Sequence, residues 1–243
     1  MPARAVALVQ FDAPPEQVEA NLARVVELTR RAAGAGARWV LFHEGTLCDY
    51  TPRLAELAQA VPDGPATAAV ARLAADCGCF VSFGLSESAA GRYFIAQVFV
   101  GPHGYVHHYR KTWLWRDQPD GGYRNEWARY DPGTGPEAFL LDGVRATCFI
   151  CADGEAPRCL ERAAALRPQV VFYPNNRGQL PDYPVFGDRA RQIGAPMLVT
   201  NRVGASWVHA CRGGCVAYGA DGQVLAAANR DGREEILHLE LQI

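Results

Sequence analysis

Three side chains that are able to attack and stabilise a carbonyl carbon follow apolar, strand-like runs of the chain. Cys151 comes directly after the run 144–150 and precedes a turn-forming Ala-Asp-Gly-Glu sequence. Glu44 follows the run 39–43, and Lys111 lies in a Tyr-Arg-Lys-Thr segment after a further strand-like stretch. A rigid strand that ends in a sharp turn suits a thiol nucleophile, for which an acid and an amine are effective partners. The set predicts a cysteine hydrolase that cleaves amides.

The chemistry of these groups explains why all three are needed. A free thiol with a pKa of about 8.5 is mostly protonated at neutral pH, so a base must take its proton. Burial among apolar strand residues would raise the pKa of Glu44 enough for this role. Lys111 would favour the thiolate and donate to the developing oxyanion. The backbone N–H of Ala152 would be the second donor, and one such donor is worth about 3 kcal/mol of transition-state stabilisation.

Each of these residues has an ordinary explanation when it is taken alone. A glutamate such as Glu44 at a strand end is often exposed or paired in a salt bridge, and Lys111 by itself would be a surface lysine. Cys151 by itself would be a small buried hydrophobic residue. The order and setting of the three residues together therefore carry the prediction of catalysis.

A further group of polar and aromatic residues is expected to bind substrate or to shape the site. They are Tyr50, Trp115, Ala152, Asp153, Asn175, Asn176 and Arg177. Asp153 either forms the turn after the nucleophile or orients a neighbouring group. The residues at 175–177 follow a strand end and either line the pocket or form an asparagine turn. Tyr50 and Trp115 either wall the site or pack against the core.

Hydrophobic periodicity predicts strands that alternate with amphipathic helices in each half of the chain. Strands are expected at 5–11, 39–42, 80–85, 93–100, 105–109, 139–141, 144–150, 170–173, 197–201, 214–218, 224–227 and 236–241. Helices are expected at 18–33, 66–76, 157–166 and 188–193. The loop 113–136 is too long for a simple connection and indicates a functional role. The pattern predicts one α/β domain over residues 1–243, with two sheets packed face to face and helices outside.

The bulk composition argues against several classes of partner. The chain has 243 residues, 49% of them hydrophobic, and a net charge of −2 without a block of like charge. This balance argues against a nucleic-acid or membrane-surface partner. The sequence shows no signal peptide and no apolar run near the ~18 residues of a membrane span, so a cytoplasmic location is expected.

Eight cysteines raise the alternative of a redox or metal protein. The pairs 77–79, 148–151 and 211–215 lack a second pair or nearby histidines at zinc-ligand spacing. In a cytosolic enzyme, cysteines are more often buried hydrophobic residues or catalysts than disulfides. We therefore expect no metal, and bound zinc or a reversible disulfide would contradict this.

Over essentially its whole length, the chain resembles the nitrilase superfamily of carbon–nitrogen hydrolases. The segments that carry the resemblance are Phe-His-Glu at 42–44, Tyr-Arg-Lys-Thr at 109–112, Ile-Cys-Ala-Asp at 150–153, Phe-Tyr-Pro at 172–174, Asp-Arg-Ala-Arg at 188–191 and Thr-Asn-Arg-Val-Gly at 200–204. The resemblance implies a four-layer αββα sandwich of two mixed sheets and a reaction without a cofactor, in which Glu44 is the general base, Lys111 the cationic stabiliser and Cys151 the nucleophile. It also implies that Glu126 is a second carboxylate of the site. Relatives commonly dimerise or assemble further, so a homodimer or larger homo-oligomer is implied as well.

The sequence departs from the family pattern at His43, where proline is usual, and at Ala152, where a bulky residue is common. We expect a hydrolase that releases ammonia or an amine from a small linear amide or N-carbamoyl (ureido) compound through a thioester. Asp153 and Glu155 favour a neutral or cationic substrate, whereas Arg177 would suit a carboxylate. The alternatives are a true nitrilase, an acyltransferase and a catalytically silent binding subunit.

Overall fold

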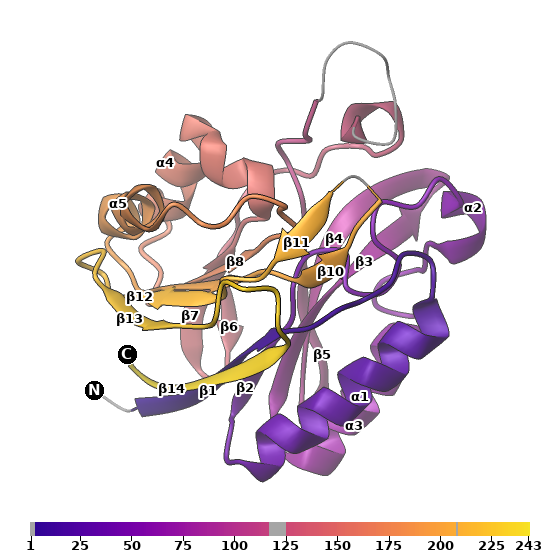
Figure 1. The fold of residues 1–243 in the computed structure, drawn as a ribbon. Coiled ribbons are helices and arrows are strands. Elements are labelled where there is room, and N and C mark those ends of the chain that lie inside the picture. The colour runs from indigo at the N-terminus through magenta and orange to yellow at the C-terminus, as the bar shows by residue number, and fades with distance from the viewer. Residues whose placement is uncertain (1–2, 117–124, 208) are drawn as a thin grey trace.

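The computed structural model describes residues 3–116, 125–207 and 209–243, and two six-stranded sheets form its centre (Figure 1). The first sheet comprises β1 (Ala3–Gln10), β2 (Trp39–Leu41), β3 (Phe80–Ala89), β4 (Arg92–Gly101), β5 (Gly104–Arg110) and β14 (Glu235–Gln242), in the order β14-β1-β2-β3-β4-β5. The second sheet comprises β6 (Phe139–Leu141), β7 (Val144–Cys148), β8 (Val170–Pro174), β9 (Met197–Thr200), β12 (Val216–Tyr218) and β13 (Val224–Ala227), in the order β13-β12-β9-β8-β7-β6. A short hairpin of β10 (Val203–Ala205) and β11 (Ala210–Arg212) forms a separate pair.

Both sheets are mixed, and each has a parallel centre. Strands β1, β2 and β3 run parallel, as do β7, β8 and β9. The strands that flank these centres pair antiparallel. The carboxyl ends of parallel strands meet at one edge of a sheet, which is where loops that carry functional residues gather in α/β proteins.

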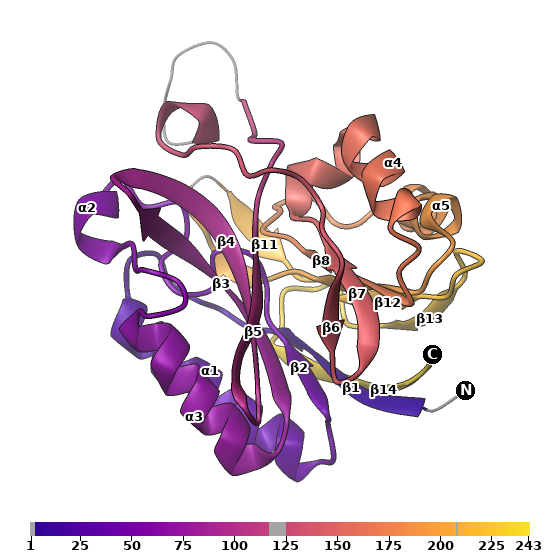
Figure 2. The same ribbon diagram turned by 180° about the vertical axis from the view of Figure 1, so that it is seen from behind.

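Helices cover the outer faces of both sheets, so the molecule has four layers (Figures 1 and 2). Helices α1 (Val18–Gly34) and α3 (Pro65–Cys77) pack on the first sheet, and α4 (Pro157–Ala165) and α5 (Tyr183–Ile193) lie on the second. The remaining helices are short, namely α2 (Leu54–Leu57) and the 3-10 helices η1 (Glu126–Ala128) and η2 (Cys151–Glu155). This αββα arrangement confirms the fold class predicted from the sequence.

Strands of the first sheet contribute side chains to two cores. In β1, Leu8 joins the core between the sheets, whereas Val9 joins the core under α1 and α3. Between the sheets, the ring centre of Phe172 lies 5.7 Å from that of Trp39 and 5.1 Å from that of Phe99. Successive side chains of a strand point to opposite faces, so a strand that is covered on both sides reads as a continuous apolar run.

The differences between the predicted and observed elements have local causes. Strand β7 ends at Cys148, two residues earlier than predicted, because the Ile150 N–H donates to the Asp153 side chain rather than to a neighbouring strand. Helix α5 begins at Tyr183, five residues earlier than predicted, because the side chain of Asp182 caps it. Helix α2 and the β10–β11 hairpin are not predicted from the sequence, because their elements of three or four residues are too short to show a period.

Candidate active site

Three of the residues predicted to be catalytic lie shortly after the ends of strands, and the fourth, Glu126, begins η1. Glu44 follows β2, Lys111 follows β5, and Cys151 is the first residue of η2 after β7. Strand β5 runs in the same direction as β3 and β2, because two antiparallel pairings relate it to β3. The turn after Glu44 packs closely on the next strand, since a Cβ atom at Gly84 would lie 2.3 Å from the backbone nitrogen of Gly45. A larger residue at that position would displace this turn.

Lys111 lies between two carboxylates. Its Nζ is 2.8 Å from Glu44 Oε1 and 2.7 Å from Glu126 Oε1, and all three side chains are buried. The Lys111 N–H donates to the carbonyl of Ile95 at 2.8 Å, which extends the pairing of β4 and β5 by one residue. Lys111 is also the only lysine among the 24 lysine and arginine residues of the chain. Every other residue of this set is arginine, so the single lysine marks a position where a compact ammonium is not equivalent to a guanidinium.

Burial sets the protonation of this cluster. Burial and the charge of Glu126 raise the pKa of Glu44 to about 7, although the opposite charge of Lys111 works against them. Burial alone would lower the pKa of Lys111, but the carboxylates of Glu126 and Glu44 outweigh it and hold that pKa well above its usual value. The cluster therefore contains a permanent ammonium beside an acid that titrates near neutral pH.

Cys151 occupies a strained turn next to this cluster. Its φ is +46°, in the left-handed region that residues other than glycine rarely adopt. Burial and the charge of Glu44 raise the pKa of the thiol to about 11, against the influence of Lys111 and Arg177. Cys151 is 9% exposed, whereas Glu44 and Lys111 have no exposed surface. The thiol is thus protonated at rest, and Cys151 is the most exposed of these three residues.

Glu126 is fixed through the backbone of Trp115. Its Oε2 accepts the Trp115 N–H at 2.7 Å, and its own N–H donates to the Trp115 carbonyl at 3.0 Å. The indole of Trp115 is 45% exposed. Trp115, which the sequence suggested as a wall of the site, therefore contributes at least its backbone to the position of the second carboxylate.

Tyr50 also belongs to this region, and a buried ion pair holds it there. The Tyr50 side chain is buried, and its ring centre is 6.0 Å from Lys111 Nζ. Its N–H donates to Asp49 Oδ1 at 2.9 Å, and the same carboxylate accepts from Asn176 Nδ2 at 2.8 Å and from Arg202 Nη1 at 3.2 Å. Asp49 and Arg202 are not among the site residues predicted from the sequence, although Arg202 lies in one of the segments that carry the family resemblance.

Asp153 connects the turn that carries Cys151 with the segment that carries Lys111. Its Oδ2 accepts from the Tyr109 hydroxyl at 2.8 Å and from the Ile150 N–H at 2.9 Å. Its Oδ1 accepts from the N–H groups of Thr112 at 3.0 Å and Trp113 at 2.5 Å. Both oxygens are thus bonded within the protein, which is the geometry of an orienting group.

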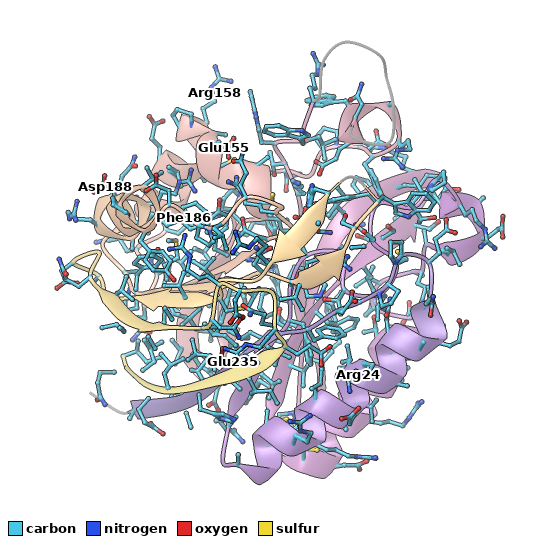
Figure 3. All side chains as sticks on the ribbon, viewed as in Figure 1. Arg24, Glu155, Arg158, Phe186, Asp188 and Glu235 are labelled. Atoms are coloured by element: carbon cyan, nitrogen blue, oxygen red, sulfur yellow. The ribbon has the colours of Figure 1, made fainter. Side chains whose placement is uncertain are left out.

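The remaining candidates lie after β8 and in η2. Asn175 is buried; its Nδ2 donates to a backbone carbonyl at 2.8 Å, and its Oδ1 has no partner among the described residues. Arg177 forms an ion pair with Glu155 and lies 5.6 Å from the ring centre of Phe186 (Figure 3, which labels Glu155 and Phe186). Ala152 is completely buried, so its contribution is that of its backbone.

His43, the residue directly before Glu44, forms a hydrogen bond with the backbone of Glu44. Its Nδ1 lies 2.8 Å from the carbonyl oxygen of Glu44 and must donate to it, because a carbonyl oxygen only accepts. Burial and the positive charge of Arg202 lower the pKa of His43 to about 3. The imidazole is therefore neutral, and Nε2 is an acceptor without a partner among the described residues.

Within residues 3–116, 125–207 and 209–243, no group of three or more His, Cys, Asp or Glu side chains is arranged to hold a metal ion. All eight cysteines lie in this part of the chain, and each is a free thiol. No described helix is long and apolar enough to cross a membrane.

Two packed mixed sheets that carry a cysteine and an acid–amine pair after their strands are the arrangement that the resemblance to the nitrilase superfamily led us to expect. The model of the carbon-nitrogen hydrolase family matches residues 5–243, and the chain belongs to this family. A mutant of the Nesterenkonia AN1 amidase from the nitrilase superfamily has the same fold, with a TM-score of 0.84 over 98% of this chain and 90% of that one, at 23% identity. A carbon-nitrogen hydrolase from Helicobacter pylori G27 superposes with a TM-score of 0.83 at 21% identity, over 98% of this chain and 88% of that one.

Curated relatives match part of the chain at higher identity. An (R)-stereoselective amidase of a Pseudomonas species is 33% identical over 66% of this chain and 57% of its own length. A nitrilase of Pyrococcus abyssi is 27% identical over 70% of this chain and 64% of its own length. The chain thus spans less than two thirds of the length of these relatives.

Proposed function

We propose that this chain is an amidase that releases ammonia or an amine from small linear amides or N-carbamoyl compounds through a thioester on Cys151. The observation that carries the proposal is the position of the Lys111 ammonium. It is held between Glu44 and Glu126, and its charge acts to lower the pKa of the Cys151 thiol. An acid with a pKa of about 7 next to a protonated thiol is suited to act as a general base at neutral pH.

In the first half-reaction, the sulfur of Cys151 attacks the carbonyl carbon while its proton passes to Glu44. Because the pKa of the thiol lies well above that of the acid, this proton transfer accompanies the attack instead of preceding it. Lys111 Nζ and the Ala152 N–H donate to the oxygen as it becomes negative. The C–N bond then breaks, Glu44 returns the proton to the leaving nitrogen, and a thioester remains.

In the second half-reaction, Glu44 is again a carboxylate and takes a proton from water as the water oxygen attacks the thioester. The C–S bond breaks, the acid product leaves, and the proton on Glu44 returns to the sulfur of Cys151. Glu126 holds the Lys111 ammonium in place throughout, because one of its oxygens stays on Nζ and the other on a backbone N–H. Each proton that the base accepts is returned within the same half-reaction.

The charges near the thiol favour a neutral substrate. Arg177 is paired with Glu155, so this part of the site carries no net charge. Lys111 is matched by Glu126, and Glu44 is the titrating base. A neutral amide or ureido group therefore enters without an uncompensated charge, whereas a substrate carboxylate would have to displace Glu155 from Arg177.

The test is ammonia release from a panel of short aliphatic amides, ureido compounds and the matching nitriles. We expect turnover of amides or ureido compounds and a trapped acyl-enzyme when hydroxylamine competes with water. The Cys151→Ala variant should lose this activity, and Cys148→Ala, which removes a buried thiol three residues earlier, should retain it. Activity confined to nitriles, or equal activity in the Cys151→Ala variant, would refute the amidase proposal.

A further inference from the structure

A buried tyrosine contacts the backbone of the nucleophile from the neighbouring strand. The hydroxyl of Tyr173, in β8, donates to the carbonyl oxygen of Cys151 at 2.7 Å. Arg189, in α5, donates to the same hydroxyl through Nη1 at 3.0 Å. Tyr173 has no exposed surface and Arg189 is 9% exposed, so both bonds are shielded from water. Burial of a charged guanidinium is costly unless it has hydrogen-bond partners, and the Tyr173 hydroxyl is one such partner of Arg189.

The turn after the nucleophile leaves space for this hydroxyl. A Cβ atom at Gly154 would lie 2.4 Å from the Tyr173 oxygen, which is closer than any real contact. Only a residue without a side chain is therefore compatible with the contact between the hydroxyl and the turn. The glycine three residues after Cys151 and the tyrosine on the next strand fit each other as a pair.

The bond to Cys151 fixes more than a carbonyl oxygen. A peptide unit is planar and trans, so its C=O and the following N–H point in opposite directions. The carbonyl of Cys151 and the N–H of Ala152 belong to one peptide unit. A hydrogen bond that holds the carbonyl therefore also sets the direction of the N–H.

This peptide unit needs external support. Cys151 has a φ of +46°, a region in which a non-glycine residue is strained, so the surrounding contacts must hold it there. The buried hydrogen bond from Tyr173, whose hydroxyl oxygen accepts from the charged Arg189, is one such contact on the carbonyl of Cys151 itself.

We propose that Tyr173, held by Arg189, is a positioning residue for the reaction: it fixes the peptide unit between Cys151 and Ala152 so that the Ala152 N–H donates to the oxyanion. This inference rests on the proposed function, because it assigns the tyrosine a role in that transition state. An oxyanion donor acts when charge develops, so a misdirected N–H lowers kcat and leaves KM nearly unchanged.

The test compares two tyrosine-to-phenylalanine variants in the same sheet. Tyr173→Phe keeps the ring contacts with Phe149 and Phe186 and removes only the hydroxyl. The control is Tyr218→Phe, in β12, because that tyrosine is completely buried and its hydroxyl has no hydrogen-bond partner among the described residues. Both variants are measured for kcat, KM and the midpoint of thermal unfolding with the best amide of the panel.

We expect Tyr173→Phe to lose about 10- to 100-fold in kcat with KM within about twofold of the parent, and Tyr218→Phe to keep the parent kcat. Equal kcat in the two variants, or a loss that lies in KM alone, would overturn the inference. A parent chain that releases no ammonia or amine from any substrate would instead refute the proposed function, and the inference with it.

A second variant tests the link through the arginine and does not depend on the folding of the first. Arg189→Gln leaves the tyrosine in place, and we expect a smaller loss that again lies in kcat. The double variant Tyr173→Phe/Arg189→Gln should have nearly the kcat of Tyr173→Phe alone, because the arginine acts through the hydroxyl that is already absent. Additive losses in kcat would contradict the inference that Arg189 acts through the Tyr173 hydroxyl.

Discussion

Glu44 Oε1 and Lys111 Nζ lie 2.8 Å apart, although 67 residues separate them in the chain and neither side chain reaches solvent. A buried lysine is stable only where its charge is compensated, and the second carboxylate, Glu126, supplies the excess of negative charge. The arrangement gives one ammonium to two carboxylates. It therefore keeps Lys111 charged and raises the pKa of Glu44, which are the states that the proposed oxyanion donor and general base require.

Lys111 should remain an ammonium far into the alkaline range. Its pKa is held well above 10.5, because the charges of Glu126 and Glu44 outweigh the burial that opposes its own charge. The chain has one lysine, so selective ¹⁵N labelling of lysine side chains gives a single Nζ signal. We expect this signal to show an ammonium at neutral pH and to keep its shift beyond pH 10.5.

The matched control is Glu126→Gln, which removes the carboxylate with the larger effect on the pKa of Lys111. In this variant the Nζ signal should titrate at lower pH than in the parent. A neutral amine signal at pH 7 in the parent would contradict the assigned role of the lysine.

Catalysis should depend on an acid with a pKa of about 7. Burial raises the pKa of Glu44 to this value, and only its carboxylate form is able to accept the proton of Cys151. The parent kcat/KM should therefore rise tenfold per pH unit below about 7 and level off above it. Glu126→Gln should move the midpoint to lower pH, since the charge of Glu126 raises the pKa of Glu44. A midpoint near 4.5, the ordinary value for glutamate, would exclude Glu44 as the buried base.

The site residues that could be predicted from the sequence are those that follow strands. Apolar runs locate the strands, and the position after a strand is fixed by the strand itself, so Glu44, Lys111 and Cys151 could be selected from the pattern. Glu126 lies in a loop without a period, and only the resemblance to a family indicated it. The sequence alone did not give its contact with Lys111, because nothing local in a chain determines which distant segments meet.

The contacts that hold these site residues in place could not be predicted from the sequence for the same reason. Asp49 and Arg202 are 153 residues apart, and neither differs in type from an ordinary surface residue. Tyr173 reads as one more apolar residue of a strand, and its hydroxyl bond to Cys151 depends on the turn after β7. The sequence thus predicts which side chains carry the chemistry, whereas the structure shows what holds them.

Asp153→Asn should destabilise the fold and impair catalysis. The carboxylate accepts four hydrogen bonds from N–H and O–H groups and a fifth from the Cys159 thiol, and an amide replaces one accepting oxygen with a donor that faces at least two donors. We expect a loss of about 2–4 kcal/mol in the free energy of unfolding, because buried donors lose their acceptor. Urea denaturation measures this loss. Asp221→Asn, at an exposed turn, is the control and should change the free energy by less than about 0.5 kcal/mol.

His43 should make the protein sensitive to acid. The pKa of this buried imidazole is lowered to about 3, whereas a histidine in the unfolded chain titrates near 6.5. Its stabilising contribution is therefore fully present above pH 6.5. It is lost as the pH falls toward 3, with a slope of up to about 1.4 kcal/mol per pH unit, because the unfolded chain binds a proton that the folded chain excludes.

His43→Asn isolates this contribution. The amide of the variant is able to donate to the carbonyl of Glu44 as Nδ1 does, but it does not titrate. The variant should have a lower free energy of unfolding at pH 7, since the ring contact with Phe11 is lost, and a shallower decline between pH 6.5 and 3. His238→Asn, on exposed β14 surface, should decline in parallel with the parent. Parallel curves for His43→Asn and the parent would show that the proton on His43 is not excluded by the fold, because the slope depends only on the difference in bound protons between the two states.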